Sequence, residues 1–415
     1  MKKFCWWCLI FFIFLMPTVS LAKTKIVYWQ YYYETKVTLV DKLIKIFEEQ
    51  NPDIEVEHVT FPYENFNQKV AASIPAGTGP DVVNLYYGWV PKYALNNYLQ
   101  PLPKEAFSEN YFQENFFPFV QEGSKFLNEY YVVPTAVRTL ALFWNKELFT
   151  KHGLDPQSPP QTLEELVEYA KNLTEYDKRG NIIIAGLTTE TGGQMHHWIR
   201  EVLVRQFGGK PYDEDNRVVL YHETPEALKF YTDLITVHKV SYPGFMNDDV
   251  TAFVSGKSAM NIDGSFRLGT LKEVGTVDFG VAELPSYNGV KSNFASFWAN
   301  GITKNAQGEK LEAAIKFVKF LASPEVMDIW LKEVGELPAN PKVAEEYYED
   351  PLYGPFLKGL EYAHITFFVD ETAQRQVILD AVDRVWLKGI EPQKSFTQAA
   401  QEEQKILDSF WQSIK

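Results

Sequence analysis

Hydrophobic residues recur with two different periods along the first hundred positions. Residues 25–30 form an apolar strand pattern and residues 54–56 alternate as a strand, whereas apolar residues over 40–47 recur at helical spacing up to an Asn-Pro pair that ends the helix. A second helical pattern over 63–74 leads to the apolar strand 82–85. This order predicts parallel strands joined by right-handed helical crossovers, and therefore an α/β layer.

Aromatic residues cluster directly after two of these predicted strands. The polar and aromatic stretch 31–34 follows the first strand, and Tyr86, Tyr87 and Trp89 follow strand 82–85. Ligands of open parallel sheets bind beyond the carboxyl ends of the strands, so these rings are candidates for the wall of a cleft. Ordinary core packing is the alternative, and these stretches alone do not separate the two interpretations.

The rest of the chain again alternates between strand and helix patterns. A long alternating run over 135–144 follows Pro134 and is suited to carry the chain from one lobe to another. Residues 163–173 form a helix that starts with a capping box, 182–184 form a buried strand, and 279–284 form another strand. A mostly helical tail closes the chain. The pattern predicts a second α/β lobe.

The first residues have the features of an export signal. A basic start precedes an apolar run over 4–16 that is too short to cross a bilayer comfortably, and small residues over 19–22 provide a signal-peptidase site. We expect cleavage after Ala22 and a periplasmic protein. Both cysteines, Cys5 and Cys8, lie inside the signal, and neither stands where a lipoprotein needs one.

Composition narrows the classes of partner. Removing residues 1–22 takes two lysines and no acidic residue from the 40 Lys and Arg and 54 Asp and Glu, so the formal net charge of −14 becomes −16. Nucleic acid and anionic lipid surfaces both favour basic proteins, so neither is expected as a partner. The remaining 393 of the 415 residues exceed what one hydrophobic core usually serves, which again predicts two lobes.

Several patterns with chemical potential have simpler explanations. The adjacent pair His196-His197 is a poor metal site because neighbouring side chains point apart, and Gly256-Lys257-Ser258 lacks the first glycine of a P-loop. The acidic pair Asp248-Asp249 and the run 213–215 could serve a secreted glycoside hydrolase, which needs two carboxylates across a cleft. Their polar surroundings favour solvated loops.

Four stretches, taken in order, carry a family resemblance. They are GPDVV and GWVPKYA within residues 79–94, ALFWNKELF at 141–149, FVSGKSAMNIDGSF at 253–266 and FVKFLASPE within 314–335. Together they span nearly the whole mature chain. The sequence resembles the family 1 extracellular solute-binding proteins of ABC transporters, the maltose- and trehalose-binding-like group.

The resemblance implies an α/β, two-lobed periplasmic-binding-protein fold with doubly wound lobes joined by three hinge crossings. We expect the signal peptide at 1–22 and place the lobes at 23–132 with 284–336, and at 133–283 with 337–415. We place the crossings near 131–136, 282–285 and 335–340.

The resemblance also implies a function. A carbohydrate, most simply a di- or oligosaccharide, would be trapped between the lobes by hinge closure and delivered to the permease subunits of an ABC importer. The protein would be a monomer without enzymatic activity, cofactor or metal. The alternatives are a secreted glycoside hydrolase, or the same fold with an anionic, non-sugar ligand.

The resemblance carries over five ligand-binding candidates. Trp298 matches an aromatic residue in the loop that re-enters the first lobe, and Phe266 lies where relatives commonly have Trp or Tyr. Asp263 is expected to accept bonds from sugar hydroxyls, and Tyr87 to offer a ring and a hydroxyl. Arg138 stands where some relatives have a carboxylate, which leaves the identity of the sugar open and keeps an anionic ligand as an alternative.

Position along the chain adds four further candidates. Gln30, Tyr63 and Trp198 lie at the ends of predicted strands or helices, and Arg375 lies between two glutamines. For each of them a core side chain or a surface charge is the competing interpretation.

Overall fold

The computed structural model describes residues 23–188 and 194–414, so the predicted signal peptide lies outside the described residues. The first part of the chain forms the predicted layer, with the elements β1 (Thr24–Tyr31), α1 (Glu34–Gln50), β2 (Ile54–Phe61), α2 (Tyr63–Ser73) and β3 (Val82–Tyr86). Strand β1 pairs in parallel with both β2 and β3. The parallel arrangement predicted from the hydrophobic pattern is confirmed.

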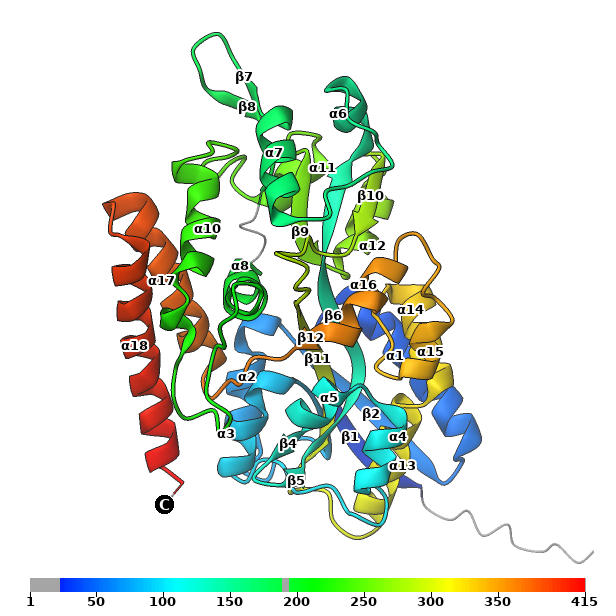
Figure 1. Cartoon of the computed structure of the whole chain (residues 1–415). Helices are drawn as coiled ribbons and strands as arrows, with labels where there is room; N and C mark the ends of the chain where they lie inside the picture. Colours follow the sequence, from blue (N-terminus) through cyan, green and yellow to red (C-terminus); the bar gives the residue numbers. More distant parts are fainter. Residues whose placement is uncertain (1–22, 189–193, 415) are drawn as a thin grey trace, which may run out of the picture.

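Two long strands connect this layer to the rest of the molecule (Figure 1). They are β6 (Val132–Asn145) and β11 (Asn293–Ile302), which pair with each other in antiparallel fashion. The sheet runs in the order β10-β6-β11-β3-β1-β2, and β9 (Met260–Gly264) also pairs with β6. Strand β10 (Phe279–Ala282) and β9 are antiparallel to β6. The sheet is therefore mixed: β1 pairs in parallel with β2 and β3, whereas β6 pairs in antiparallel fashion with β9, β10 and β11.

The helices cover both ends of this sheet. Those around β1, β2 and β3 are η1 (Tyr87–Trp89), α3 (Val90–Leu95), α4 (Glu109–Asn115), α5 (Pro118–Ser124), α13 (Glu309–Leu321), α14 (Pro324–Val334) and α15 (Pro341–Glu345). The other helices begin with α6 (Lys146–Lys151), α7 (Leu163–Leu173), α8 (Met195–His197), the π-helical turn η3 (Trp198–Leu203), α9 (Val204–Gln206), η4 (Tyr221–Glu223), α10 (Pro225–Thr236), α11 (Asp249–Val254) and α12 (Arg267–Val274). The last are α16 (Gly354–Gly359), η5 (Leu360–Tyr362), α17 (Glu371–Lys388) and α18 (Pro392–Gln412).

The short strands lie outside the main part of the sheet. Strand β12 (Ala363–His364) pairs with β11, and β4 (Lys125–Phe126) pairs with β5 (Glu129–Tyr130). Strand β8 (Ile182–Ile184) forms a two-stranded hairpin with β7 (Glu175–Tyr176), where Ile183 is 44% exposed. The predicted strand at 182–184 is confirmed, but its predicted burial is wrong, because a hairpin outside the main sheet has one face toward solvent.

Two hydrophobic cores meet at β6. Val137, Ala141 and Phe143 belong to the core beneath β1 and β3, whereas Leu142 and Trp144 belong to the core of the second lobe. Successive side chains of a strand point to opposite faces, so one strand stabilises both cores. Residues of this run therefore contribute to both cores, as expected of a segment that connects two lobes.

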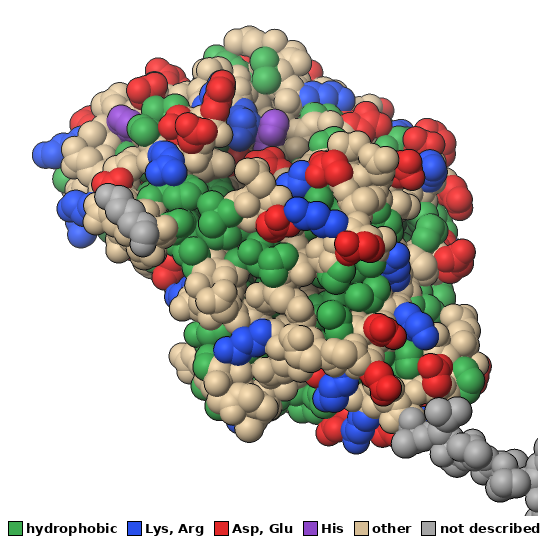
Figure 2. All heavy atoms as spheres, turned by 90° about the horizontal axis from the view of Figure 1, so that it is seen from below, with side chains coloured by type: hydrophobic (Ala, Val, Ile, Leu, Met, Phe, Trp, Pro, Cys, Tyr) green, Lys and Arg blue, Asp and Glu red, His purple; other side chains and the backbone are tan. Residues whose placement is uncertain are grey.

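Acidic and basic side chains are interspersed over the face seen in Figure 2, with hydrophobic side chains gathered toward its middle. Such a mixed surface gives no basic stripe on this face for a phosphate backbone to follow. Within residues 23–188 and 194–414, none of the helices has the length and apolar character required to cross a membrane.

A buried ion pair attaches the last helix to the second core. Glu403 of α18 accepts bonds from Arg200 at 2.7 Å, from Tyr221 at 2.9 Å and from Gln374 at 3.0 Å, and the side chains of Glu403 and Arg200 are fully buried. Glu402, the preceding residue, is partly exposed, where it pairs with Arg384 at 3.4 Å and accepts a hydrogen bond from Gln398 at 2.9 Å.

Glu403→Ala is expected to lower the free energy of unfolding by about 3–5 kcal/mol, because Arg200 would stay buried without a counter-charge. Urea denaturation followed by circular dichroism measures the loss. Glu402→Ala is the matched control on the same helix and should cost less than about 1 kcal/mol. Equal losses in the two variants would contradict this account of the pair.

Candidate functional site

A cavity of about 560 Å³ is lined by residues from both lobes and from the two connecting strands. The first lobe contributes the end of β1, the start of α2 and the end of β3. Strands β6 and β11 form its floor, and the second lobe contributes α8, α12 and α17. The carboxyl ends of β1 and β3 open into it, as expected for ligand sites of parallel strands.

Four aromatic residues form one wall of this cavity, and we call them the aromatic wall: Tyr31, Tyr63, Tyr86 and Trp298. Trp298 of β11 lies directly opposite Tyr86 of β3 in an antiparallel pair, so both side chains share one face of the sheet. Ring centroids of Trp298 and Tyr31 are 4.2 Å apart, and those of Trp298 and Tyr63 are 6.3 Å apart. The pairing of β11 with β6 shifts register at Trp298, and such irregularities often re-aim a side chain at a site.

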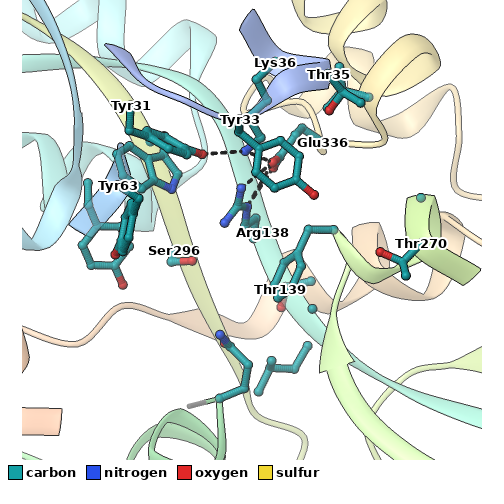
Figure 3. A pocket seen from close by; sticks show the side chains of 18 of the residues that line it. Tyr31, Tyr33, Thr35, Lys36, Tyr63, Arg138, Thr139, Thr270, Ser296 and Glu336 are labelled. Atoms are coloured by element: carbon teal, nitrogen blue, oxygen red, sulfur yellow. Dashed lines mark hydrogen bonds and ion pairs between the residues drawn. The ribbon is translucent and has the colours of Figure 1, made fainter. Parts of the chain in front are cut away.

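A cluster of charges lies beside the aromatic wall (Figure 3). Glu336 forms ion pairs with Lys36 and Arg138, and the Nε of Arg138 lies 2.9 Å from its Oε2. The Lys36 ammonium also donates to the Tyr31 hydroxyl at 2.9 Å. Burial alone would raise the pKa of Glu336, but the charges of Arg138 and Lys36 outweigh it and lower this pKa to about 2. We call Lys36, Arg138 and Glu336 the charge cluster.

The opposite wall contains Phe266, which follows β9. The guanidinium groups of Arg138 and Arg267 lie over its ring at 5.1 and 5.4 Å, within cation–π range. A Cβ on Gly264 would come within 2.4 Å of this ring. The glycine therefore lets the phenylalanine ring fold back against the turn.

Two adjacent histidines of α8 line the cavity from the second lobe. His197 stacks on Phe294 with centroids 3.5 Å apart, and His196 packs on His197 at 3.6 Å. Both rings are buried, and the Nδ1 of each has no hydrogen-bond partner among the described residues. Burial, together with the nearby positive charges of Arg200 and Arg375, lowers both pKa values well below 6.5, so both rings are neutral at pH 7.

Five of the nine residues predicted as ligand contacts line the cavity. Trp298 and Tyr63 belong to the aromatic wall, Phe266 to the opposite wall and Arg138 to the charge cluster. Arg375 lies one turn into α17 and forms an ion pair with Glu371, the first residue of that helix, at 3.3 Å.

Tyr87 and Asp263 are buried and already bonded, and they are not among the described residues that line the cavity. The Tyr87 hydroxyl donates to the carbonyl of Thr366 and accepts from its N–H, both at 3.1 Å. The Asp263 carboxylate accepts from the N–H of Gly264 at 2.7 Å and from Arg267 at 2.6 Å. Asp263 therefore supports the turn that carries Phe266.

Gln30 and Trp198 are also buried and, among the described residues, lie outside the cavity lining. Gln30 precedes Tyr31 on β1, and neighbours on a strand point to opposite faces. Trp198 packs edge-on against Tyr231 in the second core, with ring centroids 5.7 Å apart.

The sequence indicated Tyr86 and the stretch 31–34 as candidate cleft walls, but Tyr31 and Tyr86 were not among the predicted ligand contacts, and the charge cluster was not predicted as a unit. A signal existed for the two tyrosines, because both end a strand whose last residues are aromatic. No such signal existed for Glu336, which meets Lys36 only through the fold, 300 positions away in the chain. The histidine pair was considered only as a metal site and dismissed on the expectation that the two side chains point apart; this expectation is wrong, because the two rings pack against each other.

Comparison with known proteins defines the family. The profile of the bacterial extracellular solute-binding proteins matches residues 27–328, and this chain belongs to that family. The resemblance identified from the four sequence stretches is confirmed.

Two relatives of this chain are named for different ligands. The maltotriose-binding protein of Pyrococcus abyssi (strain GE5 / Orsay) is 25% identical over 358 residues, which cover 82% of this chain and 72% of the relative. The sn-glycerol-3-phosphate-binding periplasmic protein UgpB of Escherichia coli (strain K12) is 24% identical over 437 residues, covering 95% of both. Both relatives are binding proteins by name.

Solved structures agree with the fold. A cyclic α-maltosyl-1,6-maltose binding protein from Arthrobacter globiformis superposes with a TM-score of 0.80 at 21% identity, covering 94% of this chain and all of that one. A solute-binding protein of an ABC transporter from Thermotoga lettingae, bound with α-D-tagatose, gives 0.77 at 24% identity, covering 93% and 100%. The predicted α/β, two-lobed fold class is confirmed.

The buried histidines predict a loss of stability in mild acid. Below pH 6.5 the His197 ring is protonated in the unfolded chain but stays neutral in the folded protein. The free energy of unfolding therefore falls by about 1.4 kcal/mol per pH unit for each such buried ring. In His197→Phe, which keeps a ring on Phe294, the fall between pH 6.5 and 5.5 should be smaller by about 1 kcal/mol. Urea denaturation at a series of pH values measures it. Parallel curves for the two proteins would show that His197 does not contribute.

Proposed function

We propose that this protein captures a neutral carbohydrate, a di- or oligosaccharide, between its lobes and delivers it to an ABC permease. The observation that carries the proposal is the aromatic wall set beside a cluster of fixed polar groups in one cavity. A sugar ring offers apolar C–H faces that stack on aromatic rings, and hydroxyls that bond to amide, hydroxyl and charged groups. Trp298, Tyr63, Phe266, Arg138 and Arg375 are the proposed contacts retained from the sequence.

The charges around the cavity favour a neutral ligand. Lys36 and Arg138 share the carboxylate of Glu336, and Arg375 is paired with Glu371. Each of these cations therefore has a carboxylate partner before any ligand arrives. Groups that are paired in this way still donate to hydroxyls through their remaining N–H bonds, and they stay fixed while doing so.

An anionic ligand is the second candidate. The pair between Arg375 and Glu371 is the observation that favours it, because the Arg375 side chain is 36% exposed and a ligand phosphate could compete for it. The relative from Escherichia coli is named for a glycerol phosphate, and the one from Pyrococcus abyssi for maltotriose. The two candidates differ in the charge of the ligand, which a binding experiment measures.

The proposed location and mode of action are based on the family and on the predicted export signal. The protein would work in the periplasm as a monomer after cleavage behind Ala22, without a lipid anchor, cofactor or catalytic step. Hinge closure around the ligand would bring together the lobes at 23–132 with 284–336 and at 133–283 with 337–415. The connecting strands β6 and β11, which contribute to the cavity floor, support a hinge at this place.

A thermal-shift screen tests the ligand class. Maltose, maltotriose, trehalose and sucrose are compared with inorganic phosphate and sn-glycerol 3-phosphate. A bound sugar at a hundred times its Kd should stabilise the protein by about 2.7 kcal/mol and be recovered unchanged. A shift with the phosphates alone would favour the second candidate, and release of smaller sugars would indicate a hydrolase.

Trp298→Ala tests the aromatic wall. Loss of stacking should weaken the sugar that is found in the screen about tenfold or more, as measured by isothermal titration calorimetry. Trp411→Ala is the matched control, because Trp411 is also a partly buried tryptophan but stacks on Phe367 in the second lobe. Affinity that is unchanged in Trp298→Ala would exclude the aromatic wall as the binding surface.

A further inference from the structure

Glu336 is fixed by backbone structure on both of its sides. It follows Gly335, whose φ of +81° ends α14, and it precedes Leu337, which exchanges backbone hydrogen bonds of 2.9 and 3.2 Å with Val137 of β6. Arg138 is the next residue along β6. The carboxylate of Glu336 is therefore held beside the guanidinium by the fold itself, and not by a flexible loop.

The charge cluster is buried and internally bonded. The Glu336 side chain is 4% exposed, and its two oxygens accept from the Nε of Arg138 at 3.2 and 2.9 Å and from Lys36. Lys36 is in turn bonded to the Tyr31 hydroxyl. Two cations share one carboxylate, so the cluster keeps one net positive charge. Removing the carboxylate would leave two facing cations in the wall of the cavity.

We propose that Glu336 is a built-in counter-anion that determines the charge class of the ligand. It occupies the position between Lys36 and Arg138 that a phosphate or sulfate group would otherwise take, so the cavity accepts neutral polyhydroxyl compounds and refuses anions there. This inference rests on the proposed function, which it deepens by naming the residue that selects for neutral ligands.

The energetics of the cluster support this role. A phosphate that approached Lys36 and Arg138 would have to displace Glu336 or lie beside its negative charge, and like charges at contact distance are unfavourable. Glu336 stays ionised at neutral pH because its pKa is lowered to about 2. A sugar hydroxyl has no such conflict, since it can donate to the carboxylate or accept from the cations.

The test is Glu336→Gln, which preserves the shape of the side chain and removes its charge. Inorganic phosphate is titrated at pH 7.5 and constant ionic strength, with calorimetry and thermal shift as readouts. Phosphate should bind Glu336→Gln about tenfold or more tightly than it binds the wild-type protein, because it gains charge-assisted bonds to two unpaired cations. Equal phosphate affinities in the folded variant and the wild-type protein would overturn the proposal.

Glu333→Gln is the matched control. Glu333 lines the same cavity from the end of α14, but its ion pair is with Lys42 rather than with the charge cluster. It removes the same charge from the cavity wall and should leave phosphate affinity within about twofold of the wild-type value. If Glu333→Gln increased the phosphate affinity as much as Glu336→Gln does, the effect would be one of general electrostatics, and the proposal would be overturned.

A second variant keeps the proposal testable if Glu336→Gln does not fold. The double variant Lys36→Met with Glu336→Gln leaves Arg138 as the only charge of the cluster. It therefore buries one unpaired cation, whereas the single variant Glu336→Gln buries two. It should bind phosphate more tightly than the wild-type protein and, where both variants fold, more weakly than the single variant. A folded double variant with wild-type phosphate affinity would contradict the proposal.

Sugar titrations of the same proteins separate this inference from the proposed function. Failure of the wild-type protein to bind any sugar counts against the proposed function itself. If the wild-type protein binds a sugar but Glu336→Gln shows no increase in phosphate affinity, the result counts only against the role of Glu336.

Discussion

The antiparallel pairing of β6 with β11 is the interaction on which the site depends. These strands carry Arg138 and Trp298, and they join the parallel layer of the first lobe to the strands of the second. Because β6 alternates its side chains between two cores, it is held from both sides. This strand also lines the cavity, so the cavity-lining groups on both sides are positioned relative to it.

The cavity combines two kinds of surface that suit different parts of a sugar. The aromatic wall is apolar and places few demands on the ligand's orientation, since aromatic rings can stack on any C–H face of a sugar. The charge cluster is polar and specific, because its atoms are fixed by their own mutual bonds. Tyr31 joins the two, with its ring against Trp298 and its hydroxyl bonded to Lys36. A substitution that moves Lys36 would therefore also change how the Tyr31 ring packs in the aromatic wall.

The proposed preference for a neutral ligand depends on cations that are already paired with carboxylates inside the protein. Lys36, Arg138 and Arg375 would make an anion site if they were unpaired, but Glu336 and Glu371 provide the opposite charges. The histidines on the second lobe act in the same direction, because burial keeps them neutral. Together these features explain how a cavity rich in ionisable groups can suit an uncharged ligand.

Hydrophobic periodicity and motifs that are local in the chain were sufficient to predict most of the helices and strands, the α/β class and the family. The sequence also indicated the aromatic strand ends that open into the cavity. The fold sets which of two neighbouring residues lines the cavity: Tyr86 lines it whereas Tyr87 bonds to Thr366, and Tyr31 lines it whereas Gln30 does not. Only the fold brings Glu336 to Lys36, since pairing across 300 positions leaves no local pattern to read.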